Sequence, residues 1–210
     1  MSVFNKLASS QNRNDEIPNQ ELAAQIIQDN DTEAVKELVV NLANKDKAIQ
    51  SDCMKVLYEL GQQGKPELIV PYTDTFVDFL SSKNNRLVWG AMTALGTITP
   101  FATVEIWKRI DEVIRANNAG SVITQDWGVR VVATVSAKSQ EYEEKLFPYL
   151  LTFLSTCISR DVPKHGESIL VAVNKDNRDT YLAVLKSREK DLKPSQMTRI
   201  RKIYKTLENM

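Results

Sequence analysis

The stretch TFVDFLSSKNNRLVWGAMTALGTI, residues 75–98, contains two apolar helical patterns separated by a short polar turn. Its second half places Leu87, Ala91, Leu95 and Ile98 at intervals of three or four residues. This spacing gathers apolar side chains on one face of an α-helix. Because the polar turn is short, we expect the two helices to pack antiparallel as a hairpin.

The same pattern recurs along the chain. A shift of 38 residues aligns the apolar positions of residues 38–60 with those of residues 76–98: Leu38, Val39 and Leu42 with Phe76, Val77 and Leu80, and Ile49, Cys53, Leu57 and Leu60 with Leu87, Ala91, Leu95 and Ile98. A shift of 77, close to twice that period, aligns Pro71, Tyr72, Thr75 and Phe76 with Pro148, Tyr149, Thr152 and Phe153. Two further units, over residues 106–135 and 181–207, follow from helical periodicity. Helix pairs that repeat at about 40 residues are typical of an α-solenoid.

Residues 75–98 also resemble a HEAT repeat. Leucine-like residues end the first helix, a polar turn follows, and the second helix carries small residues and ends in Ala-Leu-Gly. Pro71 and Pro148 are similar to the HEAT proline that bends the outer helix, whereas Asp52 and Gly90 depart from the pattern. The resemblance covers residues 31–175 and implies an all-α fold. That fold is a right-handed α-solenoid, or α-α superhelix, of about five HEAT-like helix pairs.

The organisation expected from these repeats is a single HEAT-like domain over residues 17–210, with units of about 17–63, 64–100, 101–139, 140–175 and 176–210. Residues 1–16 are polar and weakly periodic, so we expect a flexible N-terminal segment. Pro18 opens a helix that caps one end of the domain, and a basic helix from Pro194 caps the other.

Composition narrows the partners. The chain has 27 Lys and Arg against 27 Asp and Glu, so it lacks the net positive charge that general nucleic-acid binders rely on. Three basic and seven acidic residues lie in 1–40, and eight basic and three acidic residues lie in 186–210, so opposite ends could meet in a weak homo-oligomer. No segment has the length of apolar sequence that spans a membrane, and no secretory signal is evident. We expect a cytoplasmic monomer or weak homo-oligomer.

Catalytic motifs are missing from the sequence. His165 is the only histidine, which excludes Ser-His-Asp, Cys-His and multi-histidine zinc sites within one chain. The turn that contains Gly61, Gly64 and Lys65 lacks the spacing of a phosphate-binding loop. We therefore expect no enzyme, no cofactor and no metal site, and a scaffold or adaptor instead.

The second helices of a stacked solenoid line its concave face, where we expect a protein or peptide to bind. With Leu87, Ala91, Leu95 and Ile98 in the core, Arg86, Trp89 and Thr93 project from the other side of their helix. An arginine beside a tryptophan is typical of protein-recognition surfaces; alternatively, Trp89 wedges against a neighbouring repeat. The same groove is predicted to continue along later repeats through Arg130, Lys164 and His165. Trp127 is assigned to neither role.

Nucleic-acid binding is the alternative function. Trp107 and Asp111 are spaced i, i+4, which would place an indole and a carboxylate side by side on one helix. This pair resembles the arrangement in AlkD-like DNA glycosylases, which are HEAT-like solenoids. The basic residues of the last helix would then contact the phosphates: Arg199, Arg201, Lys202 and Lys205.

Overall fold

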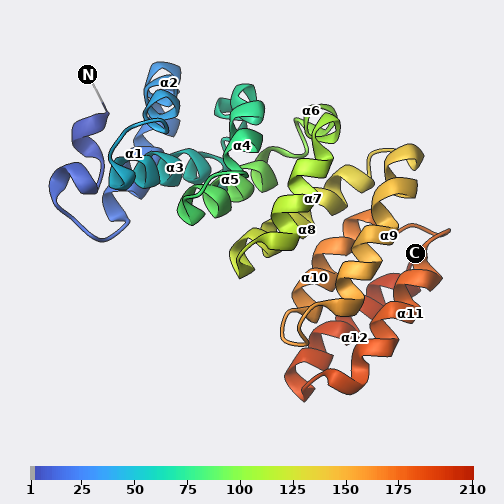
Figure 1. Cartoon of the computed structure of the whole chain (residues 1–210). Helices are drawn as coiled ribbons and strands as arrows, with labels where there is room; N and C mark the ends of the chain where they lie inside the picture. The colour runs from blue at the N-terminus through green and yellow to red at the C-terminus, as the bar shows by residue number, and fades with distance from the viewer. Residues whose placement is uncertain (1–2) are drawn as a thin grey trace. The chain divides into compact units, whose positions relative to one another are not determined.

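The computed structural model describes residues 3–210, which divide into two compact units. Unit 1 ends at Gly128, and unit 2 comprises Val129–Met210. The residues that the structure describes form twelve α-helices and six short 3₁₀ helices, without a β-strand (Figure 1).

Unit 1 begins with two 3₁₀ helices and continues through paired α-helices. Their bounds are η1 (Phe4–Lys6), η2 (Ser9–Gln11), α1 (Ile17–Asp29), α2 (Thr32–Asn41), α3 (Lys47–Gln62), η3 (Pro66–Leu68), η4 (Val70–Tyr72), α4 (Thr73–Phe79), α5 (Asn85–Ile98), α6 (Thr103–Lys108), α7 (Ile110–Ala119) and α8 (Val122–Ser136). The boundary between the units lies inside α8.

Unit 2 continues with two further helix pairs. Their bounds are α9 (Gln140–Thr156), α10 (Val162–Ile169), η5 (Leu170–Ala172), α11 (Arg178–Arg188), η6 (Glu189–Asp191) and α12 (Pro194–Glu208). Helix α9 packs against α11, and α10 packs against α12, so the first and second helices of the two pairs form separate layers.

Local sequence explains where these helices begin. Asp31 accepts a hydrogen bond from the backbone N–H of Ala34 at 2.9 Å and so caps α2. Asp46 and Asn84 cap α3 and α5 in the same way. Such caps satisfy backbone donors that have no partner within the first helical turn.

The two layers of unit 1 follow from which helices pack together. Helix α3 packs against α1 and α5, and these helices form one layer (Figure 1). Helices α2 and α4 pack onto α3 and α5 from the other side, and α6 packs against α4. Leu57 and Leu95, which the repeat aligns, are fully buried between the layers. The helices therefore alternate between layers along the chain, as predicted.

Gly90, a departure from the HEAT pattern, lies where α5 crosses α3. A Cβ atom on Gly90 would lie 2.4 Å from Cγ of Met54 and 3.6 Å from Cδ1 of Tyr58. No carbon atom tolerates the shorter of these distances, so the missing side chain lets the two helices approach closely.

The N-terminal segment, here residues 3–16, is anchored to unit 1. Val3, Leu7 and Ala8 are buried. The backbone N–H of Ala8 donates to Oδ1 of Asn19 at 3.0 Å, and that of Ser9 donates to Oδ2 of Asp52 at 2.7 Å. The expectation of flexibility over residues 1–16 thus differs from the structure for residues 3–16; residues 1 and 2 lie outside the described part. The apolar residues of this segment are too few to form a helical period, yet they are enough to dock it.

One other expectation differs in detail. Pro71 lies in η4, which ends before α4 begins, so it is not inside the first helix of its repeat. Pro148 does lie inside such a helix, α9. A proline is tolerated at the first turn of a helix, and here it starts one. A single domain over residues 17–210 stays a prediction.

Candidate functional site

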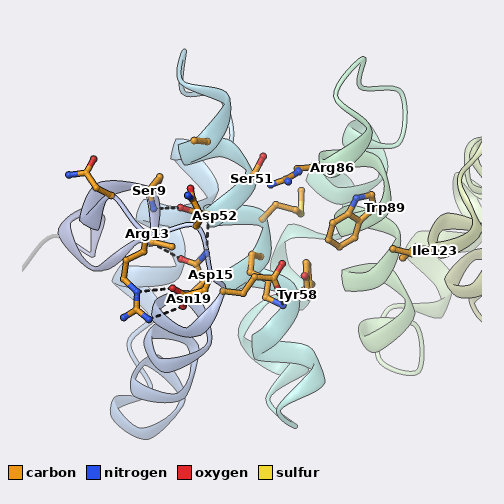
Figure 2. A pocket seen from close by; sticks show the side chains of 17 residues that line it. Ser9, Arg13, Asp15, Asn19, Ser51, Asp52, Tyr58, Arg86, Trp89 and Ile123 are labelled. Carbon is orange, nitrogen blue, oxygen red and sulfur yellow. Dashed lines mark hydrogen bonds and ion pairs between the residues drawn. The ribbon is translucent and has the colours of Figure 1, made fainter.

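A hollow of unit 1 lies over its layer of second helices. Its volume is about 790 Å³, and its walls come from the N-terminal segment, α1, α3, α5 and the first turn of α8. Figure 2 shows this arrangement, with Asp52 and Tyr58 on α3, Arg86 and Trp89 on α5, and Ile123 beyond them. The hollow brings together two residues predicted from sequence, Arg86 and Trp89.

The repeat itself positions part of this lining. Helices α3, α5 and α8 begin at residues 47, 85 and 122, at intervals of 38 and 37 residues. The second residue of each helix lines the hollow: Ala48, Arg86 and Ile123. The fifth residues of α3 and α5, Ser51 and Trp89, line it as well. Equivalent positions of successive repeats therefore face the same space.

Trp89 is half-buried and rests on an aromatic neighbour rather than inside the core. Its ring centroid lies 5.6 Å from that of Tyr58, with the planes inclined at 55°. Nζ of Lys55 lies 4.9 Å from the centroid of the Tyr58 ring on α3. Burial raises the pKa of the Tyr58 hydroxyl above its ordinary value. These contacts hold the Trp89 ring as part of the wall of the hollow.

Lys55 is locked by two carboxylates. Its Nζ lies 2.6 Å from Oε2 of Glu16 and 2.7 Å from Oε1 of Glu59. Burial acts to lower the pKa of Lys55, but the hydrogen bonds to Glu16 and Glu59 outweigh it, so the pKa is raised above its ordinary value. Lys55 stays charged, and its charge is already neutralised by chain neighbours.

The remaining acidic residues of the wall are engaged too. Asp52 accepts from the N–H of Ser9 at 2.7 Å and from Nδ2 of Asn19 at 2.8 Å. Arg13 donates to both carboxylate oxygens of Asp15 at 2.9 Å, and this hydrogen bond lowers the pKa of Asp15. The dashed bonds in Figure 2 show that these interactions hold the N-terminal segment along one edge of the hollow.

Arg86 and Trp89 differ from these residues. Within residues 3–210, the Arg86 guanidinium makes no ion pair or hydrogen bond, and neither does the indole N–H of Trp89. Arg86 is exposed and extends from α5 toward Ser51 (Figure 2). The hollow therefore presents a cation and a neutral donor that described chain groups do not satisfy.

Thr93 does not join this pair. Its side chain is 2% exposed, and its hydroxyl donates to the backbone oxygen of Trp89 at 2.8 Å. The prediction that it projects into the groove is wrong because α5 is covered on nearly every side, including the side opposite its core stripe. Trp127 is placed by the same packing: a Cβ on Gly96 would lie 2.3 Å from its ring, so Trp127 packs on α5.

The three groove residues predicted for later repeats lie in unit 2. Arg130 on α8 and Lys164 on α10 are exposed. His165 is 1% exposed, and its ring meets that of Phe153 edge-on at 5.2 Å. His165 is a core residue, which corrects its assignment to a binding surface, because its helix turns this side toward α9.

The prediction that Trp107 and Asp111 lie on one continuous helix is wrong. Trp107 is in α6, which ends at Lys108, whereas Asp111 is in α7, which begins at Ile110. The helix breaks at Arg109, whose guanidinium lies 2.7 Å from Asp78 and 2.8 Å from Glu112. The resemblance to a glycosylase site was based on positions i and i+4 of a single helix, and this break separates those positions into two helices.

The basic residues of α12 are at the surface. Arg199 pairs with Glu167, its Nε lying 2.8 Å from the carboxylate. Arg201, Lys202 and Lys205 are exposed. Nucleic-acid binding through α12 stays a prediction.

Several residues of the hollow were missed from sequence, among them Asp52, Lys55, Tyr58 and Ile123. The repeat held a usable signal, because a shift of 38 places Trp89 on Ser51 and Arg86 on Ala48. Asp52 was visible as a departure from the HEAT pattern. The contribution of the N-terminal segment to the hollow could not be predicted from the repeat, because this segment belongs to no repeat.

Among residues 3–210, no three His, Cys, Asp or Glu side chains gather as a metal site requires. Within the same residues, no helix is both long enough and apolar enough to cross a bilayer.

Three solved structures are similar to this chain in fold. An engineered protein is 15% identical, with a TM-score of 0.62, over 100% of this chain and 98% of its own. A designed armadillo repeat protein is 13% identical, with a TM-score of 0.64, over 90% of this chain and 87% of its own. A mutant of the karyopherin Kap121p is 15% identical, with a TM-score of 0.64, over 90% of this chain and 21% of its own.

No family model and no curated protein sequence matches the chain. At these identities the structural likeness establishes the fold. The chain is an all-α helical-repeat solenoid of the armadillo/HEAT-like kind, as the sequence repeats predicted.

Proposed function

We propose that this chain is a non-enzymatic scaffold that binds a protein segment in the hollow of unit 1. The observation that supports it most directly is the pair Arg86 and Trp89, which lines the hollow without polar partners among the described residues. Arginine and tryptophan are the side chains that most often dominate the energy of protein recognition. The free thiols Cys53 and Cys157 suit a reducing compartment, so the proposed site of action is the cytoplasm.

A scaffold explains the hollow better than an enzyme does. The carboxylates along its walls, Asp15, Glu16 and Asp52, are each committed to an internal hydrogen bond or ion pair. The sole histidine of the sequence is buried in unit 2. General acid-base chemistry needs a group that is free to exchange a proton with substrate, and these groups are held by structural partners.

Selection from a library tests the proposal without a known ligand. Random twelve-residue peptides displayed on phage are selected on the immobilised full chain and then compared on an Arg86→Ala/Trp89→Ala variant. Truncation of hot-spot residues costs about 2 kcal/mol or more, so we expect selected peptides to bind the variant at least about 30-fold more weakly.

The matched control is Phe101→Ala/Arg115→Ala, which removes one exposed aromatic and one exposed cation outside the hollow. Both variants are checked by thermal unfolding. Peptides that bind wild type, variant and control equally, or a library that yields no binder, would refute the proposed site.

A further inference from the structure

The charge pattern of the hollow indicates what kind of peptide it takes. Three cations line it: Arg13, Lys55 and Arg86. Arg13 is paired with Asp15, and Lys55 with Glu16 and Glu59. Only the charge of Arg86 is left for a ligand among the cations that the described residues place here.

The acidic residues of the wall are less available to a ligand than Arg86 is. Asp15 and Glu16 are neutralised by the pairs above, and Asp52 has its two oxygens on Ser9 and Asn19. A cationic ligand would have to compete with these chain partners, so it gains less from the acidic residues than an anionic ligand gains from Arg86, whose charge no described residue pairs with. Among the lining side chains of α3, α5 and α8, the groups that gain a first polar partner on binding are Arg86 and the Trp89 indole N–H, and both are donors.

Apolar surface surrounds these two donors. Ile123 is 45% exposed at the equivalent position of the next second helix. The Trp89 ring on α5 and Met54 on α3 supply further apolar lining. A matching group is therefore an anionic acceptor carried beside an apolar side chain.

We infer that the hollow binds an extended peptide that presents an aspartate or glutamate carboxylate to Arg86, with an apolar side chain beside it against Trp89 and Ile123. This inference rests on the proposed function and specifies its ligand. The carboxylate accepts from the guanidinium, and the indole N–H donates to the same carboxylate or to a peptide carbonyl.

Geometry sets the length of this peptide. Packed helices lie about 8 to 10 Å apart, so the path from α3 across α5 to α8 is about 20 Å. An extended chain advances about 3.3 Å per residue, so about six residues span this path. An eight-residue peptide is therefore long enough to contact all three helices.

A polyanion such as nucleic acid fits this hollow poorly. Binding of successive phosphates needs several available cations along a track. Within the described lining, one cation is available and three carboxylates stand around it. A single carboxylate on an otherwise apolar peptide meets Arg86 without facing the others.

Three sub-libraries of eight-residue peptides provide the test. Each peptide carries one variable position near its middle, which is glutamate, glutamine or lysine according to the set, and the other seven positions carry mixed apolar and small uncharged residues. A hydrogen bond to a charged group contributes about 1.5 to 3 kcal/mol. We therefore expect the full chain to bind the glutamate set about 10- to 100-fold more tightly than the glutamine set.

Substitutions of Arg86 separate charge from shape. Arg86→Gln should bring the ratio of glutamate to glutamine binding close to one, and Arg86→Lys should restore part of it because lysine keeps the charge but loses the planar fork. Arg115→Gln, which removes an exposed arginine outside the hollow, should leave the ratio unchanged.

The outcomes also distinguish this inference from the proposed function. If glutamine or lysine peptides bind as tightly as glutamate peptides and Trp89→Ala still weakens them, the hollow is a binding site but the acidic preference is wrong. If no sub-library binds, or if binding ignores both Arg86 and Trp89, the proposed function fails together with the inference.

Discussion

Asp52→Ala should release the N-terminal segment from α3. The Asp52 carboxylate accepts hydrogen bonds from the N–H of Ser9 at 2.7 Å and from Nδ2 of Asn19 at 2.8 Å, and both sites are partly buried. A hydrogen bond to a charged group contributes about 1.5 to 3 kcal/mol, and water replaces part of it at a partly buried site. We expect the free energy of unfolding to fall by about 2 to 3 kcal/mol.

Hydrogen exchange gives a local readout of the same change. The Ser9 amide donates to Asp52, and the Ala8 amide donates to Asn19, which Asp52 orients. A loss of about 2 kcal/mol in the opening free energy speeds exchange about 30-fold. Both amides should show this acceleration, and amides in the middle of α5, which open only on global unfolding, should accelerate by no more than the fall in the free energy of unfolding.

Glu33→Ala is the matched control, since Glu33 makes an exposed ion pair with Lys36 and removal of such a pair is nearly neutral. Equal stability of wild type and Asp52→Ala, to within about 0.5 kcal/mol, with unchanged Ser9 exchange, would refute the role assigned to Asp52.

Three further predictions concern packing and titration. Gly61→Ala should cost about 1 to 3 kcal/mol, because its Cβ would lie 2.0 Å from Oγ1 of the β-branched Thr97; adding Thr97→Ala should recover most of that loss in a denaturant titration. Leu95→Ala should cost about 2 to 5 kcal/mol by opening a buried cavity, whereas Trp89→Ala should cost about 1 kcal/mol; equal losses would place Trp89 in the core. Burial raises the pKa of the Cys53 thiol from 9.0 to about 12, so the unfolded thiol ionises first and stability falls as pH rises through that window. Cys53→Ala should flatten this fall, and an unchanged slope would contradict the assignment.

The fold was predictable because packing repeats in sequence. Leu57 and Leu95 occupy equivalent positions in two repeats, and the helical spacing of apolar residues indicates which side of each helix packs against its neighbours. Thr93 was misplaced because periodicity assumes one buried face, whereas α5 is enclosed by neighbouring helices on most sides. A stripe of apolar residues defines one contact surface and does not show that the opposite side is free.

The site was less predictable because some of its residues follow from the repeat pattern, whereas others depend on contacts between residues far apart in the sequence. Arg86 and Trp89 could be found from the helix that carries them. Arg109 could not be expected to break a helix, since one of the ion pairs that hold it involves Asp78, which lies 31 residues earlier in the chain. The N-terminal segment likewise gains its structure from Asp52, a contact that spans 43 residues.

The proposed specificity follows from what the repeat leaves undetermined. Ala48, Arg86 and Ile123 hold one position in three successive second helices, yet they differ in size, charge and polarity. Core packing therefore does not dictate the side chain at this position, and the choice is open to a ligand. No described residue forms an ion pair or hydrogen bond with the Arg86 guanidinium, so a ligand can bind it without breaking an internal contact. A ligand with a carboxylate at Arg86 and an apolar side chain toward Ile123 complements the side chains at these equivalent positions. If these positions determine which ligand binds, Arg86→Glu reverses the charge there and should change the preference from glutamate peptides to lysine peptides.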